Sequence, residues 1–168
     1  DRCLSRGLGD VYKRQGLETH CQLKTQSKMF CACANEFGAD PNTNVCPVCL
    51  GMPGVLPVPN ERALQLTALT GYLLNCEVPK FAKFDRKNYF YPDVCKDYQI
   101  TQFDFPSTTT GHVDFEFEGG IERVRITRAH LEEDVGKNNH FDQHSGVDFN
   151  RAGVCLLYTS DAADDWSS

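Results

Sequence analysis

The stretch HVDFEFEGGIERVRITRAHLEEDVGK, which runs from His112 to Lys137, decides the fold of this chain. Apolar and polar residues alternate through its first part, stop at Gly119-Gly120, and alternate again afterwards. The alternating apolar residues are Val113, Phe115, Phe117, Val124 and Ile126. Alternation with a period of two is typical of half-buried strands, and paired glycines often form a hairpin turn. The stretch therefore predicts a β-hairpin that turns at Gly119-Gly120.

The returning strand of this hairpin leads into RAHLEEDVGK, which places three acids in a row at Glu132, Glu133 and Asp134. Two interpretations are open at this point. A short charge run is usually a solvated face, here the start of a helix. Alternatively, the carboxylates contribute ligands to a divalent metal, which prefers oxygen donors. The choice depends on which other residues lie nearby.

Upstream, GLETHCQLKT from Gly16 to Thr25 also alternates and predicts a strand. Side chains two positions apart share a strand face, so Glu18 and His20 point to the same side. A polar face exposed to water would explain this pair alone. Together with one carboxylate from Glu132 or Glu133, the pair would form a site suited to Mg²⁺.

The segment NERALQLTALTGYLLN predicts a helix that begins after the N-cap residue Asn60. Its apolar residues recur near helical spacing, so one face is expected to pack inward, and Gly71 is expected to weaken the helix. These apolar residues are Ala63, Leu66, Leu69, Leu73 and Leu74. YQITQFD adds a short strand. The elements together predict an α+β fold, predominantly an antiparallel sheet with a packed helix.

Four of the nine cysteines form two short pairs, Cys-x-Cys and Cys-x-x-Cys, separated by twelve residues. They are Cys31, Cys33, Cys46 and Cys49. Two such pairs on tight turns can supply four thiolates to one Zn²⁺, much as in zinc ribbons. Four thiolates leave no open coordination position, so we expect a structural zinc that staples the irregular segment from Met29 to Pro59. Free buried cysteines are the alternative.

The other cysteines have no partner at ligand spacing, and we expect them to be ordinary. They are Cys3, Cys21, Cys76, Cys95 and Cys155.

The loop DRKNYFYPD combines cations with aromatic residues. Magnesium in enzymes usually accompanies a nucleotide, so Arg86 and Lys87 would contact phosphates. Tyr89, Phe90 and Tyr91 would be available to pack on a base or a ribose. A surface turn whose aromatics enter the core is the alternative. The sequence has no Walker-type glycine loop, so any ATP site would be formed by carboxylates.

The composition limits the classes of protein to consider. A chain of 168 residues fits one domain that can bury a core without disulfides. A net charge of −6 offers no general attraction to nucleic acid. No apolar run approaches the roughly 20 residues of a membrane span, and the N-terminus shows no signal-peptide pattern. We therefore expect no membrane association and a location in the cytoplasm or an organelle matrix.

Several long stretches resemble, in the same order, the GatB family of tRNA-dependent amidotransferase subunits. They are GLETHCQLKT, the FCxC segment with ADPNTNVCPVCLGMPGVLP, KFDRKNYFYPD, YQITQFD and ITRAHLEEDVGK. The resemblance covers residues 16–154. It implies a catalytic domain like that of glutamine synthetase, a cradle of antiparallel strands lined with metal-binding carboxylates. This chain would hold part of that cradle, with the zinc segment 31–49 as an insertion.

The resemblance also implies an activity. GatB works with an amidase subunit, GatA, and a small clamp subunit, GatC. It uses ATP and Mg²⁺ to phosphorylate the side-chain carboxylate of glutamate mischarged on the glutamine tRNA. Ammonia from the amidase subunit then displaces the phosphate. Some complexes convert aspartyl-tRNA to asparaginyl-tRNA in the same way.

Roles for individual residues follow from the same resemblance. Glu18 and His20 match the metal-site pair of the family, and Glu133 matches its acidic partner, with Glu132 as a weaker candidate. Lys87 and Tyr89 match positions that line the active site. Arg86, Lys87 and Lys137 are then expected to bind ATP.

The resemblance stops at both ends of the chain. Residues 1–15 and 155–168 depart from the family pattern, and we expect both tails to be foreign sequence fused to a genuine fragment. The domains that contact tRNA would be missing, so the chain alone is expected neither to amidate tRNA nor to bind it tightly.

A non-enzymatic zinc module that binds a partner is the competing class of function. The segment from Cys31 to Cys49 has two acids and no Lys or Arg, which disfavours nucleic acid as that partner.

Overall fold

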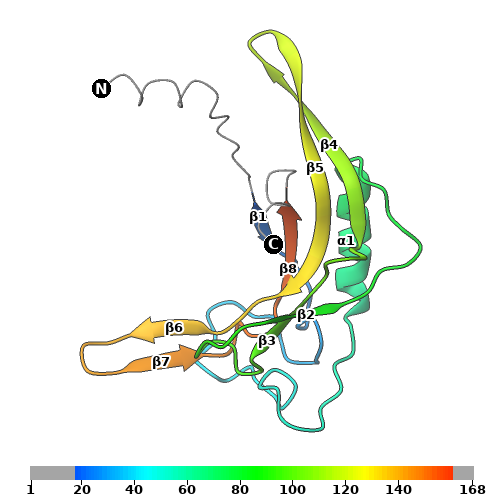
Figure 1. Ribbon diagram of the computed structural model, residues 1–168. Coiled ribbons are helices and arrows are strands. Elements are labelled where there is room, and N and C mark those ends of the chain that lie inside the picture. Colours follow the sequence, from blue (N-terminus) through cyan, green and yellow to red (C-terminus); the bar gives the residue numbers. More distant parts are fainter. Residues whose placement is uncertain (1–17, 161–168) are drawn as a thin grey trace, which may run out of the picture.

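The computed structural model describes residues 18–160, which form one helix and eight strands (Figure 1). Their bounds are β1 Thr19–Gln22, α1 Glu61–Leu73, β2 Asp85–Asn88, β3 Tyr98–Thr101, β4 Thr108–Phe117, β5 Gly120–Glu133, β6 Lys137–His140, β7 Ser145–Asp148 and β8 Cys155–Ser160. The predictions for Cys3, Gly16, Leu17, the first tail and residues 161–168 lie outside the described residues. No helix among residues 18–160 is long and apolar enough to span a membrane.

Four strands form one antiparallel sheet in the order β1-β8-β5-β4. β8 lies between β1 and β5, so it joins the N-terminal strand to the hairpin. Figure 1 shows α1 beside β4 and β5, on one side of this sheet. Two further pairs, β2-β3 and β6-β7, are separate two-stranded antiparallel sheets. The predicted α+β character, mostly antiparallel sheet with a packed helix, is confirmed.

β8 is formed by residues that the sequence pattern assigned to a tail. Cys155 and Leu157 of this strand are almost fully buried, and the strand is hydrogen-bonded on both edges. Residues 155–160 are therefore an integral part of the sheet.

The β4–β5 hairpin turns one residue earlier than predicted. Phe117 pairs with Gly120, which leaves Glu118 and Gly119 as the two loop residues. Their φ angles are 50° and 82°, the positive values that both residues of a type I′ turn require. Gly120 is the first residue of β5. The prediction of a hairpin is confirmed, and the predicted turn position is wrong because Glu118 adopts a left-handed conformation.

The helix begins where predicted, because the Asn60 side chain accepts hydrogen bonds from the backbone of Arg62 and Ala63. Its inward face agrees with the prediction at Ala63, which is buried, and at Leu66, which packs against the core, and differs from it elsewhere. The buried residues are Ala63, Thr67 and Gly71, whereas Leu69 and Leu73 are 53% and 73% exposed. A Cβ at Gly71 would lie 2.6 Å from Cγ2 of Thr108 on β4. Small residues therefore face the sheet, because the space between Gly71 and Thr108 admits no larger side chain.

The main hydrophobic core lies on the face of the sheet that α1 covers. Thr108, against which Gly71 packs, is paired with Ala129 of β5, and this pair marks the covered face. The buried residues of the core are Leu23, Met29, Phe30, Ala63, Ile100, Ala129, Leu131, Cys155 and Leu157.

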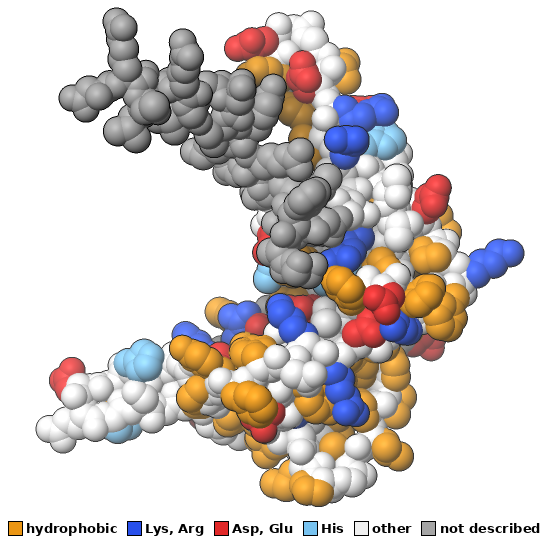
Figure 2. Space-filling model, viewed as in Figure 1, with side chains coloured by type: hydrophobic (Ala, Val, Ile, Leu, Met, Phe, Trp, Pro, Cys, Tyr) orange, Lys and Arg blue, Asp and Glu red, His pale blue; other side chains and the backbone are white. Residues whose placement is uncertain are grey.

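The segment between β1 and α1 is irregular, as predicted, with a single isolated bridge between Ser27 and Ala34. It exposes large apolar side chains, namely Phe37, Met52, Leu56 and Val58. Figure 2 shows hydrophobic side chains gathered in the lower part of the molecule, where Figure 1 places these loops. Met29 and Phe30 at the start of this segment are buried in the core, whereas the exposed stretches after them need another source of order.

Gly111 of β4 gives a direct test of the close packing between the sheet and the end of the helix. A Cβ there would lie 2.2 Å from Sγ of Cys76 and 2.7 Å from the backbone oxygen of Leu74. Gly111→Ala is expected to destabilise the protein by about 1–3 kcal/mol, because overpacking forces the backbone to shift. Urea unfolding measures the change. Gly120→Ala is the control, since its Cβ meets nothing closer than 3.8 Å. Equal midpoints for the two variants would contradict this packing.

Candidate functional site

The register divides the sheet residues into two faces, because successive side chains of a strand point to opposite sides. The covered face contains Ala129, Leu131 and Glu133 of β5. The other face contains Arg128, His130 and Glu132. Across it, His130 lies opposite Tyr158, and Tyr158 lies opposite His20. We call this second face, with Glu18, His20, Arg128, His130, Glu132 and Tyr158, the site face.

Aromatic contacts on the site face connect β1 to β5 through Tyr158 of β8. The ring centroids of His20 and Tyr158 are 4.3 Å apart, and those of Tyr158 and His130 are 4.9 Å apart. Glu18 directly precedes β1, and its negative charge acts on the pKa of His130. Glu18 and His20 therefore lie close to residues of β5, as the metal-site prediction requires.

Glu132 is the acid of RAHLEEDVGK that the structure brings to the site face. It is 5% exposed, and its Oε2 lies 3.8 Å from Nζ of Lys87 on β2. Tyr89 is also near, because burial and the negative charges of Asp93, Glu132 and Asp134 raise the pKa of its hydroxyl. The interpretation as a solvated helix start is wrong, since Glu132 and Glu133 end a strand and both are buried.

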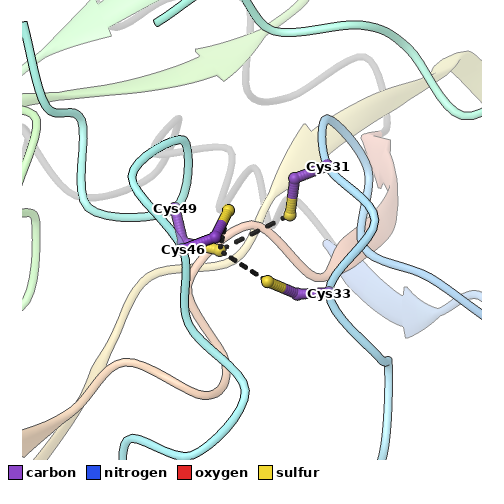
Figure 3. A group of neighbouring side chains, drawn as sticks. All are labelled: Cys31, Cys33, Cys46 and Cys49. Atoms are coloured by element: carbon purple, nitrogen blue, oxygen red, sulfur yellow. Dashed lines mark hydrogen bonds between the residues drawn. The ribbon is translucent and has the colours of Figure 1, made fainter.

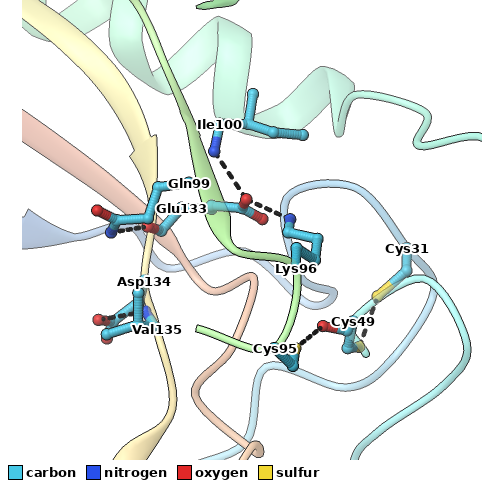
Figure 4. Close-up of polar contacts among 9 residues, drawn as sticks. All are labelled: Cys31, Cys49, Cys95, Lys96, Gln99, Ile100, Glu133, Asp134 and Val135. Atoms are coloured by element: carbon cyan, nitrogen blue, oxygen red, sulfur yellow. Dashed lines mark hydrogen bonds and ion pairs between the residues drawn. The ribbon is translucent and has the colours of Figure 1, made fainter. Parts of the chain in front are cut away.

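Glu133 points to the opposite, covered face (Figure 4). Its carboxylate pairs with Nζ of Lys96 and accepts a hydrogen bond of 2.8 Å from the backbone N–H of Ile100. Its backbone oxygen accepts a hydrogen bond from Gln99. Burial raises the pKa of the Glu133 carboxyl, an effect that Lys96 opposes. The structure therefore separates Glu133 from Glu18 and His20 and uses it to attach β3 to β5.

Of the three residues predicted to contact the nucleotide, only Lys87 lies near the site face. The Arg86 guanidinium lies 4.7 Å from the ring centroid of Tyr98, on the opposite side of β2 from Lys87. Lys137 begins β6 and is exposed, in a two-stranded sheet apart from the site face. Phe90 and Tyr91 are 82% and 63% exposed, so the alternative in which they enter the core is wrong.

Arg128 and His130 are site-face residues that sequence reasoning missed. The alternation in Arg128-x-His130-x-Glu132 is a usable signal, because it places the three side chains on one face. Burial, with the positive charges of Arg128, Lys87 and His20, lowers the pKa of His130 to about 4. Its imidazole is therefore neutral at pH 7, and its buried Nδ1 has no hydrogen-bond partner among residues 18–160.

The site face is not a preformed metal cage. Within residues 18–160, the four clustered cysteines are the only group of three or more Cys, His, Asp or Glu ligand atoms close enough to hold one ion. Glu18, His20 and Glu132 come from different strands of the sheet and would have to converge around an ion that also binds phosphates.

The four cysteines converge as predicted (Figure 3). Sγ of Cys49 lies 3.4 Å from Cys31, 3.6 Å from Cys46 and 3.7 Å from Cys33. Four sulfurs at about 2.3 Å from a tetrahedral Zn²⁺ would be about 3.8 Å apart. These separations are far longer than the roughly 2.05 Å of a disulfide. The arrangement therefore fits a four-thiolate metal site.

Within this cluster the thiolate is favoured at Cys49 and disfavoured at two other cysteines, because the hydrogen bond with Cys49 raises the pKa of Cys31 and burial raises the pKa of Cys33 to about 11. A hydrogen bond from Cys31 lowers the pKa of Cys49 to about 4, with the charge of Lys28 acting in the same direction. Lys28 is fully buried, and its Nζ donates to Sγ of Cys49 at 3.4 Å. It also donates to the backbone oxygens of Asn44 and Phe149, so it joins the cluster to the segment before β8.

Among residues 18–160, the cysteines outside the cluster are not close enough to other possible ligands to form a metal site. Sγ of Cys95 donates to the backbone oxygen of Cys49 and thus supports the cluster from outside. Cys76 and Cys155 are buried, and Cys21 is exposed.

A comparison with protein families gives one match. The family model described as GatB/GatE catalytic domain matches residues 14–164. The match includes both the site face and the four cysteines.

Curated relatives agree with this match. Proteins named as the B subunit of aspartyl/glutamyl-tRNA(Asn/Gln) amidotransferase are 53% identical in Methylacidiphilum infernorum, 54% in Frankia casuarinae and 56% in Brevibacillus brevis. These matches cover 89%, 84% and 84% of this chain and 33%, 30% and 30% of the respective relatives. The chain thus spans about a third of the length of the curated relatives it matches.

Proposed function

Because the chain belongs to the GatB/GatE catalytic domain family, we propose that its site face takes part in the ATP-dependent amidation of an amino acid attached to tRNA. The substrate would be glutamate on the glutamine tRNA or aspartate on the asparagine tRNA, as the names of the relatives suggest. The observation that supports this proposal most is that Glu18, His20 and Glu132 share one face of the sheet, with Lys87 beside Glu132.

The proposed reaction has two steps. An oxygen of the substrate side-chain carboxylate attacks the γ-phosphorus of ATP, the bond from that phosphorus to the bridging oxygen breaks, and ADP leaves. Ammonia then attacks the acyl carbon, the bond to the phosphate oxygen breaks, and the nitrogen loses a proton. Phosphorylation is needed because a carboxylate oxygen is a poor leaving group, whereas phosphate is a good one.

We assign roles on the site face by chemistry. Glu18, His20 and Glu132 are the candidate ligands of Mg²⁺, which neutralises charge on the phosphate oxygens when bound. Lys87 neutralises further charge beside Glu132, and Tyr89 lines the same side. Arg86 and Lys137 stay predicted ATP contacts. Glu133 stays a predicted ligand, although its carboxylate is occupied by Lys96 and Ile100.

We further propose that the four-stranded sheet is part of a cradle like that of glutamine synthetase. The whole protein would work with an amidase subunit and a small clamp subunit, in the cytoplasm or an organelle matrix. Its tRNA contacts would lie outside this chain.

The test of this function uses the full-length subunit assembled with its partner subunits. Mischarged glutamyl-tRNA, ATP, Mg²⁺ and ammonium are supplied, and both ADP and the amidated aminoacyl-tRNA are measured. The proposal predicts ADP formation that depends on the mischarged tRNA. Amidation without ATP consumption, or no amidation by the wild-type complex, would refute it.

We propose that the four cysteines bind a structural Zn²⁺ that orders the segment between β1 and α1. Cys49→Ser is expected to lose the bound zinc and to make residues 26–59 sensitive to limited proteolysis, while the sheet stays folded. Cys95→Ser is the matched control and is expected to keep one zinc per chain, because Cys95 contacts only a backbone oxygen of the cluster. Atomic emission measures the zinc content of both variants. A Cys49→Ser variant that keeps one zinc per chain would contradict the assignment.

A further inference from the structure

In the part of the chain that the structure describes, Arg128 has a buried donor that no acceptor uses, unlike three other basic residues that form ion pairs. Arg123 pairs with Asp114, Arg151 with Asp134, and Lys96 with Glu133. Within residues 18–160, Arg128 makes no ion pair, and its buried Nε has no hydrogen-bond acceptor. A guanidinium has five N–H donors and keeps its charge, so leaving a buried donor unused is costly.

The position of Arg128 is fixed by its surroundings. It is half-buried at the end of the buried part of β5, opposite Thr109 of β4. The ring centroid of Phe103 lies 5.4 Å from its guanidinium carbon. An arginine held against an aromatic ring loses little further freedom when it binds a ligand, since its donors are already oriented.

The neighbourhood of Arg128 on the site face contains both basic and acidic side chains. Arg128, His20 and His130 share the site face, and Lys87 adds a positive charge beside Glu132. The rings of His20 and His130 both contact Tyr158, with centroids 4.3 Å and 4.9 Å from its ring, so these side chains lie in one cluster. The two acids on the same face, Glu18 and Glu132, would bind a cation.

We propose that Arg128 is the oxyanion-binding residue of the site face, contacting phosphate or carboxylate oxygens of a substrate through its guanidinium. The inference rests on the proposed function and adds a residue to it. Glu18 and Glu132 would bind the metal at one part of the site face. Arg128 would bind the anionic oxygens of the substrate at another part of the same face. The planar fork of arginine matches the geometry of both phosphate and carboxylate oxygens.

The test uses the full-length subunit in its complex and compares Arg128→Gly with Arg128→Lys. Arg128→Gly is expected to lower kcat/KM for tRNA-dependent ADP formation by about 10- to 100-fold, as loss of one oriented donor group does. Added guanidinium ion is expected to restore much of the loss, which a purely structural role would not allow. Arg128→Lys keeps the charge without the fork, and its activity is expected to fall between those of Arg128→Gly and the wild type.

Arg125→Gly is the matched control. It removes the same side chain from the same strand, but Arg125 is exposed and points to the opposite face. Its activity is expected to equal that of the wild type with or without guanidinium.

The substrate that shows the raised KM identifies the anion. A raised KM for ATP assigns a phosphate to Arg128, and a raised KM for the aminoacyl-tRNA assigns the side-chain carboxylate. Wild-type activity in both Arg128 variants would overturn this inference alone, as would a folded Arg128→Gly that guanidinium does not restore. If Arg128→Gly fails to fold, unchanged kinetics of Arg128→Lys would overturn it. An inactive wild-type complex would instead refute the proposed function.

Discussion

Glu132→Gln is expected to lower kcat of the full-length enzyme in its complex by about 100- to 1,000-fold, a loss typical when a charge-stabilising group is removed from an active site. The amide has the size of the carboxylate but carries no negative charge, so it is a poor ligand for Mg²⁺. It also leaves Lys87 without its anionic partner at 3.8 Å. Thermal unfolding of the variant is expected to stay close to that of the wild type, since the change is isosteric.

Glu122→Gln is the matched control for this prediction. Glu122 lies on β5 as well, at the exposed end of the hairpin, and is expected to be neutral in the same assay. Glu133→Gln gives a second comparison, because it is expected to lower stability together with activity. Full activity in Glu132→Gln would contradict the assignment of the site face and favour Glu133 as the metal ligand.

Lys96→Met is expected to destabilise the protein by about 3–5 kcal/mol, because it leaves the buried Glu133 carboxylate without its counter-charge. The two side chains are only 12% and 4% exposed, so water cannot replace the lost partner. The backbone N–H of Ile100 would be the remaining close donor to this carboxylate among the contacts in Figure 4. Urea denaturation followed by far-UV circular dichroism measures the loss.

Two variants separate the buried pair from a general effect of losing a lysine. Adding Glu133→Leu to Lys96→Met is expected to recover part of the stability, since replacing both partners removes the unpaired charge. Lys83→Met breaks an exposed pairing with Asp85 and Asp104 and a contact with the Phe105 ring, and it is expected to change stability little. A Lys96→Met variant as stable as Lys83→Met would show that the pair does not stabilise the contact between β3 and β5.

The main elements of this fold could be predicted from local pattern, and the details that depend on tertiary packing could not. The hairpin and the Asn60 cap follow from alternation and capping chemistry within a few residues. The inward face of α1 does not, because the close approach to Thr108 selects Gly71 and Thr67 over the leucines. β2 has no local signal either, since the four residues of this strand, Asp85–Asn88, are all polar.

The site could be predicted only as far as the pairing of strands was known. Alternation shows that Glu18 shares a face with His20, and that Glu132 and Glu133 point apart. It cannot show which of the two acids faces His20, because β8 sets that register from residues expected to be a tail. Once β8 is in place, Glu132 lies on the site face and Glu133 does not.

The most direct measurement of the site assignment is a crystal structure of the full-length complex with Mn²⁺ in place of Mg²⁺ and a non-hydrolysable ATP analogue. Anomalous scattering locates the ion independently of the refined side chains. We expect an anomalous peak on the site face, bound by Glu132 and by Glu18 or His20. A peak bound by Glu133 on the covered face, or an ion with no ligand from this sheet, would contradict the assignment.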